Sequence, residues 1–211
     1  MENPIKLVLP PIEENCYIIP DGRGKAIVID PGSSPKIISD KLEKYGLLPE
    51  KILLTHGHFD HISGAAYLKE KYGAEVLVHR NDEPMLSDMV KAGGLAAPFF
   101  KYVPVECDGY FEEGDIIKQG ELELRVIETP GHTKGSVCFI SDDSIFTGDT
   151  IFRGSVGRTD LYTGDRADLN RSLKKLKALN ENYRLYCGHG ENSNLDREKL
   201  TNPFLAEEIF N

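Results

Sequence analysis

The residues best suited to chemistry lie in one short stretch, Thr-His-Gly-His-Phe-Asp-His at positions 55–61. Three of the six histidines of the chain and one aspartate fall within it. Imidazole nitrogens and carboxylate oxygens are ligands that zinc and similar cations take from proteins. A single loop histidine is usually an ordinary surface residue, but this density of ligand types is specific and predicts a metal site.

Three more residues of the same types follow predicted strands elsewhere in the chain. His132, Asp149 and His189 each come directly after a glycine, at the end of an apolar run. The ends of neighbouring strands lie close together, so such edges often carry binding sites. Glycine lets the backbone bend sharply at these points. We therefore expect the three side chains to converge on the histidine-rich stretch.

The spacing inside the stretch predicts that its ligands are divided between two metals. His56 and His58 occupy alternate positions on a tight turn and can bind one cation. His132 then completes a three-histidine set on this first cation.

The remaining ligands of the stretch suit a second cation. Asp60 and His61 are adjacent, so their side chains diverge from the first pair. His189 joins them on the second cation, and Asp149, with two carboxylate oxygens, bridges the two metals. We expect Asp60 and Asp149 to be catalytic as well as metal-binding. The sequence leaves the metal open, with zinc favoured and iron or manganese as alternatives.

The elements that position these residues alternate between strands and helices. Strands are predicted at 5–9, 16–19, 25–30, 51–54, 75–79, 121–128, 136–140, 144–147 and 184–187. Helices are predicted at 36–45, 61–72, 84–91 and 168–179, with a short one near the C-terminus. Residues 92–108 and 150–165 are expected to be irregular. This alternation predicts sheets packed between helical layers.

Composition limits the class of protein. A chain of 211 residues with a net charge of −9 is expected to form one domain, 1–211, and to bind no nucleic acid. We expect neither a signal peptide nor a membrane span. Four scattered cysteines without a Cys-x-x-Cys pair predict reduced thiols and a cytoplasmic location. The sequence sets no oligomeric state.

The motifs together resemble those of a known family. Thr-His-Gly-His-Phe-Asp-His, Gly-His-Thr-Lys-Gly-Ser at 131–136, Thr-Gly-Asp-Thr at 147–150 and Gly-His-Gly at 188–190 resemble the metallo-β-lactamase superfamily. The resemblance implies an α+β fold, a four-layer αβ/βα sandwich of two mixed β-sheets flanked by helices, with two metals at one edge. Val-Ile-Asp-Pro-Gly at 28–32 is similar to the N-terminal signature of the family, which implies that Asp30 supports the site without binding metal.

Within the superfamily, Gly-Asp-Thr-Ile-Phe at 148–152 followed by Gly157-Arg158 resembles glyoxalase II, in its short bacterial form. That branch implies hydrolysis of a small-molecule thioester, S-lactoylglutathione or a related acyl thioester, by a hydroxide that bridges two metals. Only 22 residues follow His189, so the C-terminal glutathione-binding helical domain of full-length relatives is not expected. Arg158 stands where these relatives place a substrate-holding lysine, and with Lys134 it is our candidate for substrate binding.

Other activities remain open. The stretch Gly157-Arg158-Thr159-Asp160 also resembles persulfide dioxygenases, a resemblance that implies a single Fe(II) held by His56, His132 and Asp149. Hydrolysis of a lactone or another ester is a less favoured alternative. Asp149 combined with His61 departs from true β-lactamases.

Three other features have a structural and a functional interpretation. His79 is expected to be structural or to support a ligand, and Cys187 to belong to the core. Phe99, Phe100 and Tyr102 are expected to pin a loop to the core or to shape an acyl pocket.

Overall fold

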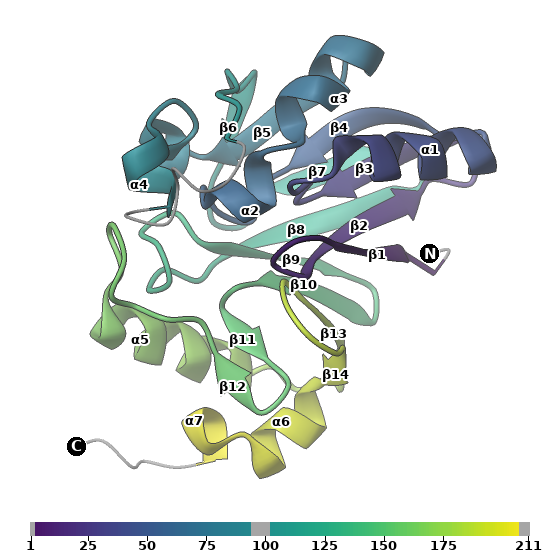
Figure 1. The fold of residues 1–211 in the computed structure, drawn as a ribbon. Coiled ribbons are helices and arrows are strands. Elements are labelled where there is room, and N and C mark those ends of the chain that lie inside the picture. The colour runs from purple at the N-terminus through teal and green to yellow at the C-terminus, as the bar shows by residue number, and fades with distance from the viewer. Residues whose placement is uncertain (1–2, 94–101, 207–211) are drawn as a thin grey trace.

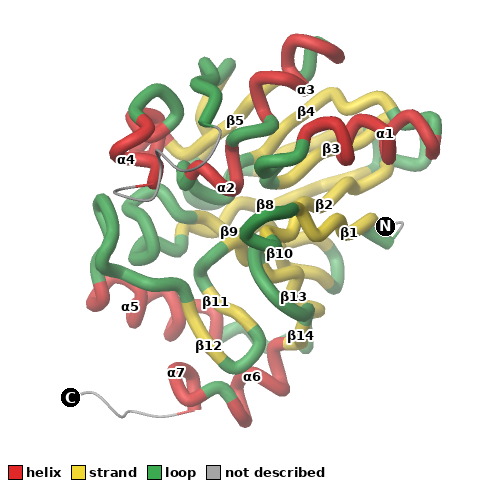
Figure 2. Tube along the Cα trace, in the orientation of Figure 1, coloured by secondary structure: helices red, strands yellow, loops and turns green. Residues whose placement is uncertain are grey.

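The computed structural model describes residues 3–93 and 102–206. Within them, two six-stranded sheets face each other, and helices cover the outer side of each (Figure 1). Figure 2 shows the same layers by colour, with the strands between two groups of helices. The predicted α+β sandwich of two mixed sheets is confirmed.

The first sheet carries the strand that leads into the histidine-rich stretch. Its spatial order is β1 (Ile5–Leu9), β2 (Glu14–Pro20), β3 (Lys25–Ile29), β4 (Leu48–Leu53), β5 (Glu75–His79) and β6 (Gly109–Phe111). Strands β3 to β6 are mutually parallel. The chain segments that follow β3, β4 and β5 therefore leave the sheet at one edge.

The second sheet carries the other three ligand-bearing turns. Its order is β14 (Ser193–Asn194), β13 (Arg184–Cys187), β10 (Ser144–Gly148), β9 (Val137–Ser141), β8 (Leu122–Glu128) and β7 (Ile116–Gln119). Strand β10 is parallel to β13, and β9 is antiparallel to both β8 and β10. Thus β8, β10 and β13 run in one direction, and the turns after them open at the same edge.

The central strands are buried on both faces because each sheet lies between two layers. In β2, Cys16 and Ile18 pack toward the first group of helices, whereas Tyr17 and Ile19 pack between the sheets. The two-residue period of a strand produces this division. It explains why the central strands are continuous apolar runs.

The helices form the two outer layers. The first sheet is covered by α1 (Pro35–Tyr45), α2 (Phe59–Ile62), α3 (Ala65–Tyr72) and α4 (Met89–Gly93), and the second by α5 (Arg166–Lys177), α6 (Leu195–Thr201) and α7 (Pro203–Ala206). The predicted helices at 36–45 and 168–179 are confirmed in place. α1 ends at Gly46, which has a φ of 64°, and Asp165 caps α5 by accepting from the Asp168 N–H.

The prediction of one helix at 61–72 was wrong. The structure has α2 and α3, with a break at Ser63-Gly64. The Gly64 N–H donates to the Pro31 carbonyl at 2.8 Å, and a Cβ on Gly64 would lie 2.6 Å from the Gly32 carbonyl oxygen. Helical periodicity does not reveal this contact with the turn after β3, which interrupts the helix.

The prediction of a helix at 84–91 was also wrong. A 3₁₀ helix, η1 (Arg80–Met85), comes first, and α4 begins at Met89. The Asp88 carboxylate accepts from the N–H groups of Val90 and Lys91 at 3.0 and 3.2 Å. A carboxylate that satisfies the first free donors starts a new helix inside the predicted range.

Several short strands were not predicted. β6 and β7 have three and four residues, and the hairpin of β11 (Ile151–Phe152) and β12 (Ser155–Val156) lies in the expected irregular segment 150–165. Strands this short carry little periodic signal.

The expected loop at 92–108 is described only in part. Residues 102–108 have no helix or strand, and the Tyr102 hydroxyl donates to the Met85 carbonyl at 2.9 Å, which pins this end to the core. Phe99 and Phe100 lie outside the described residues, so a covering role for them stays a prediction.

None of the helices formed by residues 3–93 and 102–206 is long and apolar enough to cross a membrane.

Candidate metal centre

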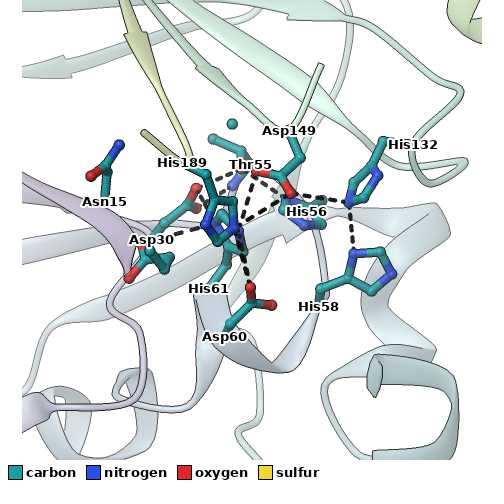
Figure 3. Close-up of polar contacts among 12 residues, drawn as sticks. Asn15, Asp30, Thr55, His56, His58, Asp60, His61, His132, Asp149 and His189 are labelled. Atoms are coloured by element: carbon teal, nitrogen blue, oxygen red, sulfur yellow. Dashed lines mark hydrogen bonds and ion pairs between the residues drawn. The ribbon is translucent and has the colours of Figure 1, made fainter. Parts of the chain in front are cut away.

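The three-histidine group expected on the first cation is brought together at the shared edge of the sheets (Figure 3). His56 and His58 lie on the turn after β4, and His132 lies on the turn after β8. One ring nitrogen of each histidine lies within 4.8 Å of the others, and His58 Nδ1 is 2.8 Å from His132 Nε2. All three side chains are buried.

The second expected group lies beside the first. Asp60 and His61 are in the short helix α2, and His189 follows β13. His189 Nε2 is 3.3 Å from His61 Nε2 and 3.3 Å from Asp60 Oδ2. Asp60 and His61 thus both reach His189 from adjacent positions of α2.

Asp149 contacts both groups. Its Oδ1 is 3.4 Å from His61 Nε2, and its Oδ2 lies 3.5 Å from His132 Nε2 and 3.6 Å from His189 Nε2. A Cβ on Gly188 would lie 2.3 Å from Asp149 Oδ1, so only glycine leaves room for the carboxylate here. Asp149 therefore lies between the two groups of expected ligands, and its role as a bridge between two metals stays a prediction.

The donor atoms fit a pair of divalent cations. Among the described residues, His56 Nε2 and Asp149 Oδ1 are buried without a hydrogen-bond partner, which is costly unless a ligand satisfies them. Burial lowers the pKa of His58 to about 3, and burial with the neighbouring histidines lowers the pKa of His56 well below its usual range. Both rings are therefore neutral, the state in which imidazole binds a metal.

A hydrogen-bonded chain behind the ligands orients two of the histidines. The Asp30 carboxylate accepts from the Thr55 N–H at 2.7 Å and from the Thr55 hydroxyl at 2.6 Å. Since that hydroxyl donates to Asp30, it accepts from His56 Nδ1 at 3.0 Å. His61 Nδ1 donates to Asp30 Oδ2 at 3.0 Å. Nε2 of both histidines is thus the ring nitrogen that faces the site and can bind a metal, and a carboxylate behind a ligating imidazole raises its basicity.

Asp30, His56 and His61 could also be grouped as a metal site by distance alone. The Asp30 oxygens are already occupied by Thr55 and His61, which makes the carboxylate a support for the ligands. Its backbone has a φ of 49°, an uncommon value for a residue other than glycine. Thr55 was not identified from the sequence, although it precedes the first histidine.

His132 is oriented in the same way by a different partner. Its Nδ1 donates to the Arg158 carbonyl at 2.7 Å, which leaves Nε2 free to face Asp149 and His58. A Cβ on Gly157 would lie 1.9 Å from the Asp149 carbonyl, so this loop can approach His132 only with glycine at that position.

The charges of the second group are coupled to one another. Burial alone would lower the pKa of His61, but the carboxylates of Asp149 and Asp60 raise it well above its usual range. Burial alone would raise the pKa of the Asp149 carboxyl. His61, together with His132 and His189, instead lowers this pKa well below the usual range. A positive charge at this position is therefore strongly stabilised by the carboxylates around it.

Asn15 holds the turn that carries His189, and the sequence did not single it out. Its side-chain amide donates to the carbonyls of Cys187 and Gly190 at 2.8 and 3.0 Å, on either side of the histidine. Its N–H donates to the Gly188 carbonyl at 2.8 Å. The one feature of the sequence that could have pointed to Asn15 is its polar side chain within the buried strand β2.

A cleft of about 600 Å³ opens over the ligands. Apart from the ligands and Arg158, its described wall is apolar, formed by Ile12, Phe59, Ala92, Gly93 and Leu161.

The two substrate-binding candidates differ in position. Arg158 lines the cleft, and two of its guanidinium nitrogens donate to the Asp160 carboxylate at 2.7 Å each. Lys134 is exposed and does not belong to the described wall. The structure thus brings Arg158 to the ligands and leaves Lys134 outside the cleft.

The sixth histidine and the neighbouring cysteine lie outside the ligand group. His79 Nε2 is 3.1 Å from Glu128 Oε1, and His79 Nδ1 accepts from the Asn81 N–H. Cys187 is buried, and burial raises the pKa of its thiol to about 12, which makes it unreactive. The expected core position of Cys187 is confirmed.

Comparison with known proteins agrees with this geometry. Residues 9–189 match the profile of the Metallo-beta-lactamase superfamily. The hydroxyacylglutathione hydrolase GloC of Haemophilus influenzae is 34% identical over 200 residues, which cover 92% of this chain and 93% of that protein.

Two crystal structures share the fold over almost the whole chain. The BLEG-1 B3 metallo-beta-lactamase has a TM-score of 0.92 and 30% identity, with 97% of this chain and all of that one covered. The di-iron-bound form of TTHA1623 has a TM-score of 0.84 and 36% identity, with 95% of this chain and all of that one covered.

Proposed function

Since the chain belongs to the metallo-beta-lactamase superfamily, we propose that it is a thioester hydrolase that binds two divalent cations. The substrate class is a hydroxyacyl thioester such as S-lactoylglutathione. The observation that carries the proposal is the position of Asp149, within 3.6 Å of ligands from both histidine groups. The similarity to GloC supports the substrate class.

When bound, the two cations would polarise the thioester carbonyl and lower the pKa of a water so that it acts as a nucleophile at neutral pH. The ligands proposed for them are His56, His58, His132, Asp60, His61 and His189, with Asp149 shared. Asp30 and Thr55 keep Nε2 of His56 and of His61 free for metal. Zinc is the proposed metal, with iron as the alternative that the di-iron relative suggests.

The cleft would hold the acyl group against this centre. Its apolar wall excludes water from the side of the thioester that does not react. Arg158 is placed to meet an anionic group of the thiol carrier, in exchange for its contact with Asp160. A thiolate leaves readily, so no strong general acid is required, in agreement with a cleft floor made of metal ligands. The four cysteines are free, which supports a reducing compartment such as the cytoplasm.

The test combines metal content with turnover. The full chain is purified, its zinc, iron and manganese per chain are measured, and hydrolysis of S-lactoylglutathione is assayed beside a β-lactam and a lactone. We expect two metals per chain and preference for the thioester, with Asp149→Asn losing both activity and bound metal. One iron per chain with oxygen uptake on glutathione persulfide would identify a dioxygenase instead. Full activity of a metal-depleted Asp149→Ala variant would refute any role of metal.

A further inference from the structure

One fully buried carboxylate joins the two turns that carry the three-histidine group. Asp82 lies in η1, outside the proposed ligands, and its side chain has no exposure to solvent. Asp82 Oδ2 accepts from the Gly57 N–H at 2.9 Å, on the turn between His56 and His58. Asp82 Oδ1 accepts from the Gly135 N–H at 2.8 Å, on the turn that follows His132.

A third donor reinforces the connection to the second sheet. The Thr133 hydroxyl, directly after His132, donates to Asp82 Oδ2 at 2.6 Å. The Thr133 N–H donates to the Ser136 hydroxyl at 3.0 Å, which closes the turn on itself. Three donors from two sheets thus converge on one carboxylate, and two of them are backbone amides that can only donate.

The glycines of both turns leave the space that this carboxylate needs. A Cβ on Gly135 would lie 2.6 Å from Asp82 Cγ and Oδ1. A Cβ on Gly57 would lie 2.7 Å from Met85 Cβ and 3.1 Å from the Asp82 carbonyl. Neither glycine has a positive φ, so close packing against η1, and not backbone conformation, requires glycine at these positions.

The connection matters because the two turns come from different sheets. His58 Nδ1 and His132 Nε2 lie 2.8 Å apart, and both must stay within reach of one cation. A shift of one sheet against the other would move one of these nitrogens out of reach of that cation. Groups behind the ligands that fix such geometry commonly control metal affinity.

We propose that Asp82 is a positioning residue that holds the His56–His58 turn and the His132 turn in register and so sets the affinity of the three-histidine group for metal. The inference rests on the proposed metal centre. It assigns Asp82 no contact with metal or substrate.

The test is a zinc titration of the metal-free full chain in competition with a chromophoric chelator. Asp82→Asn has the same shape but only one acceptor oxygen, so at least one backbone N–H faces an amide that also donates. We expect one zinc to bind about 10- to 100-fold more weakly, as for other groups behind metal ligands, and the second to bind as in the wild type. The weakening is expected to persist in a His189→Ala background, where only the three-histidine group is intact.

Gly135→Ala provides an independent perturbation that changes no polar group. Its Cβ displaces the same carboxylate, so we expect the same selective weakening, and the double variant should be no weaker than either single one. If Asp82→Asn does not fold, Thr133→Val removes one of the three donors, and a smaller loss at the same zinc is expected.

Glu198→Gln is the matched control. Glu198 is also fully buried and accepts from the Gly154 N–H, the Ser193 hydroxyl, the Asn202 amide and the Arg197 guanidinium, none of which lies on the turns of His56, His58 and His132. The Glu198→Gln substitution should lower the melting temperature and leave both zinc affinities unchanged. The positioning role would be overturned if Asp82→Asn lowered the stability of the metal-free chain but left both zinc affinities unchanged. Additive effects of Asp82→Asn and Gly135→Ala on zinc affinity would overturn it as well. A wild type that binds no zinc would instead overturn the proposed function on which it rests.

Discussion

Asp30→Asn keeps the size of a buried side chain while it removes the charge and one of two acceptor oxygens. In the wild type, Asp30 Oδ1 accepts from the Thr55 N–H, and Oδ2 accepts from the Thr55 hydroxyl and from His61 Nδ1. An asparagine has one oxygen and one NH₂ group for these three donors.

Both orientations of the asparagine are unfavourable. If its NH₂ group replaces Oδ2, His61 Nδ1 must accept, and the proton moves to Nε2, the atom that faces Asp149 and His189. If its NH₂ group replaces Oδ1, it meets the Thr55 N–H, and two buried donors face each other.

The expected loss of zinc affinity follows from the hydrogen bond that His61 Nδ1 can no longer donate. A buried donor without an acceptor costs about 1–3 kcal/mol. Since a tenfold change in affinity corresponds to about 1.4 kcal/mol, the second zinc should bind roughly 5- to 150-fold more weakly. The first zinc should be less affected, because Asp30 reaches only one of its three histidines, His56, and does so indirectly through the Thr55 hydroxyl. His58 and His132 have no contact with Asp30 among the described interactions.

Calorimetric titration of zinc into the metal-free chain measures both affinities. Asp143→Asn is the control, since Asp143 is an exposed partner of Arg184 on the surface and should bind both zinc ions as the wild type does. If Asp30→Asn also binds both zinc ions with wild-type affinity, the hydrogen bonds through Thr55 do not set the histidine tautomers.

Three further outcomes are expected. Gly148→Ala places a Cβ 2.2 Å from the Thr55 hydroxyl at a φ of 46°, so thermal unfolding should show a loss of about 1–3 kcal/mol, and an unchanged melting temperature would contradict the strain. Burial of Glu198 opposes its ionisation, but the hydrogen bonds that its carboxylate accepts lower its pKa in the folded chain. The ionised carboxylate therefore stabilises the fold fully above the unfolded pKa, and this stabilisation is lost as pH falls through the lower folded pKa. The difference in melting temperature between the metal-free wild type and Glu198→Gln should therefore shrink below about pH 4.3, and a constant difference would refute this. Arg158→Ala should raise KM for an anionic thioester about 2- to 5-fold with little change in kcat, and Asp160→Asn, which frees the guanidinium, should lower KM; steady-state kinetics on both variants decides this.

Strand and helix positions could be predicted where the chain pattern is long and regular. The strand at 75–79 and the helices that include Ile38 and Leu173 were found because their side chains alternate or repeat with the period of the element. The break at Gly64 could not be predicted, since its cause is the carbonyl of Gly32, a residue on another element.

The residue types available for the centre can be found from the chain without any coordinates. His132, Asp149 and His189 can be recognised as candidate ligands because each follows a strand and a glycine. No distance between them is needed for this. The family and its sandwich fold follow from the same motifs, because their order along the chain is specific.

How those residues are held depends on contacts that form only in the folded chain. Thr55, Asn15 and Asp82 bind the ligand turns through hydrogen bonds that join segments far apart in the chain, and no local pattern encodes such partners. Likewise, it is the position of Arg158 at the cleft and of Lys134 outside it that separates two similar charges. The physical reason is that a ligand's type is a property of one residue, whereas its tautomer, orientation and access depend on neighbours that only folding brings into contact.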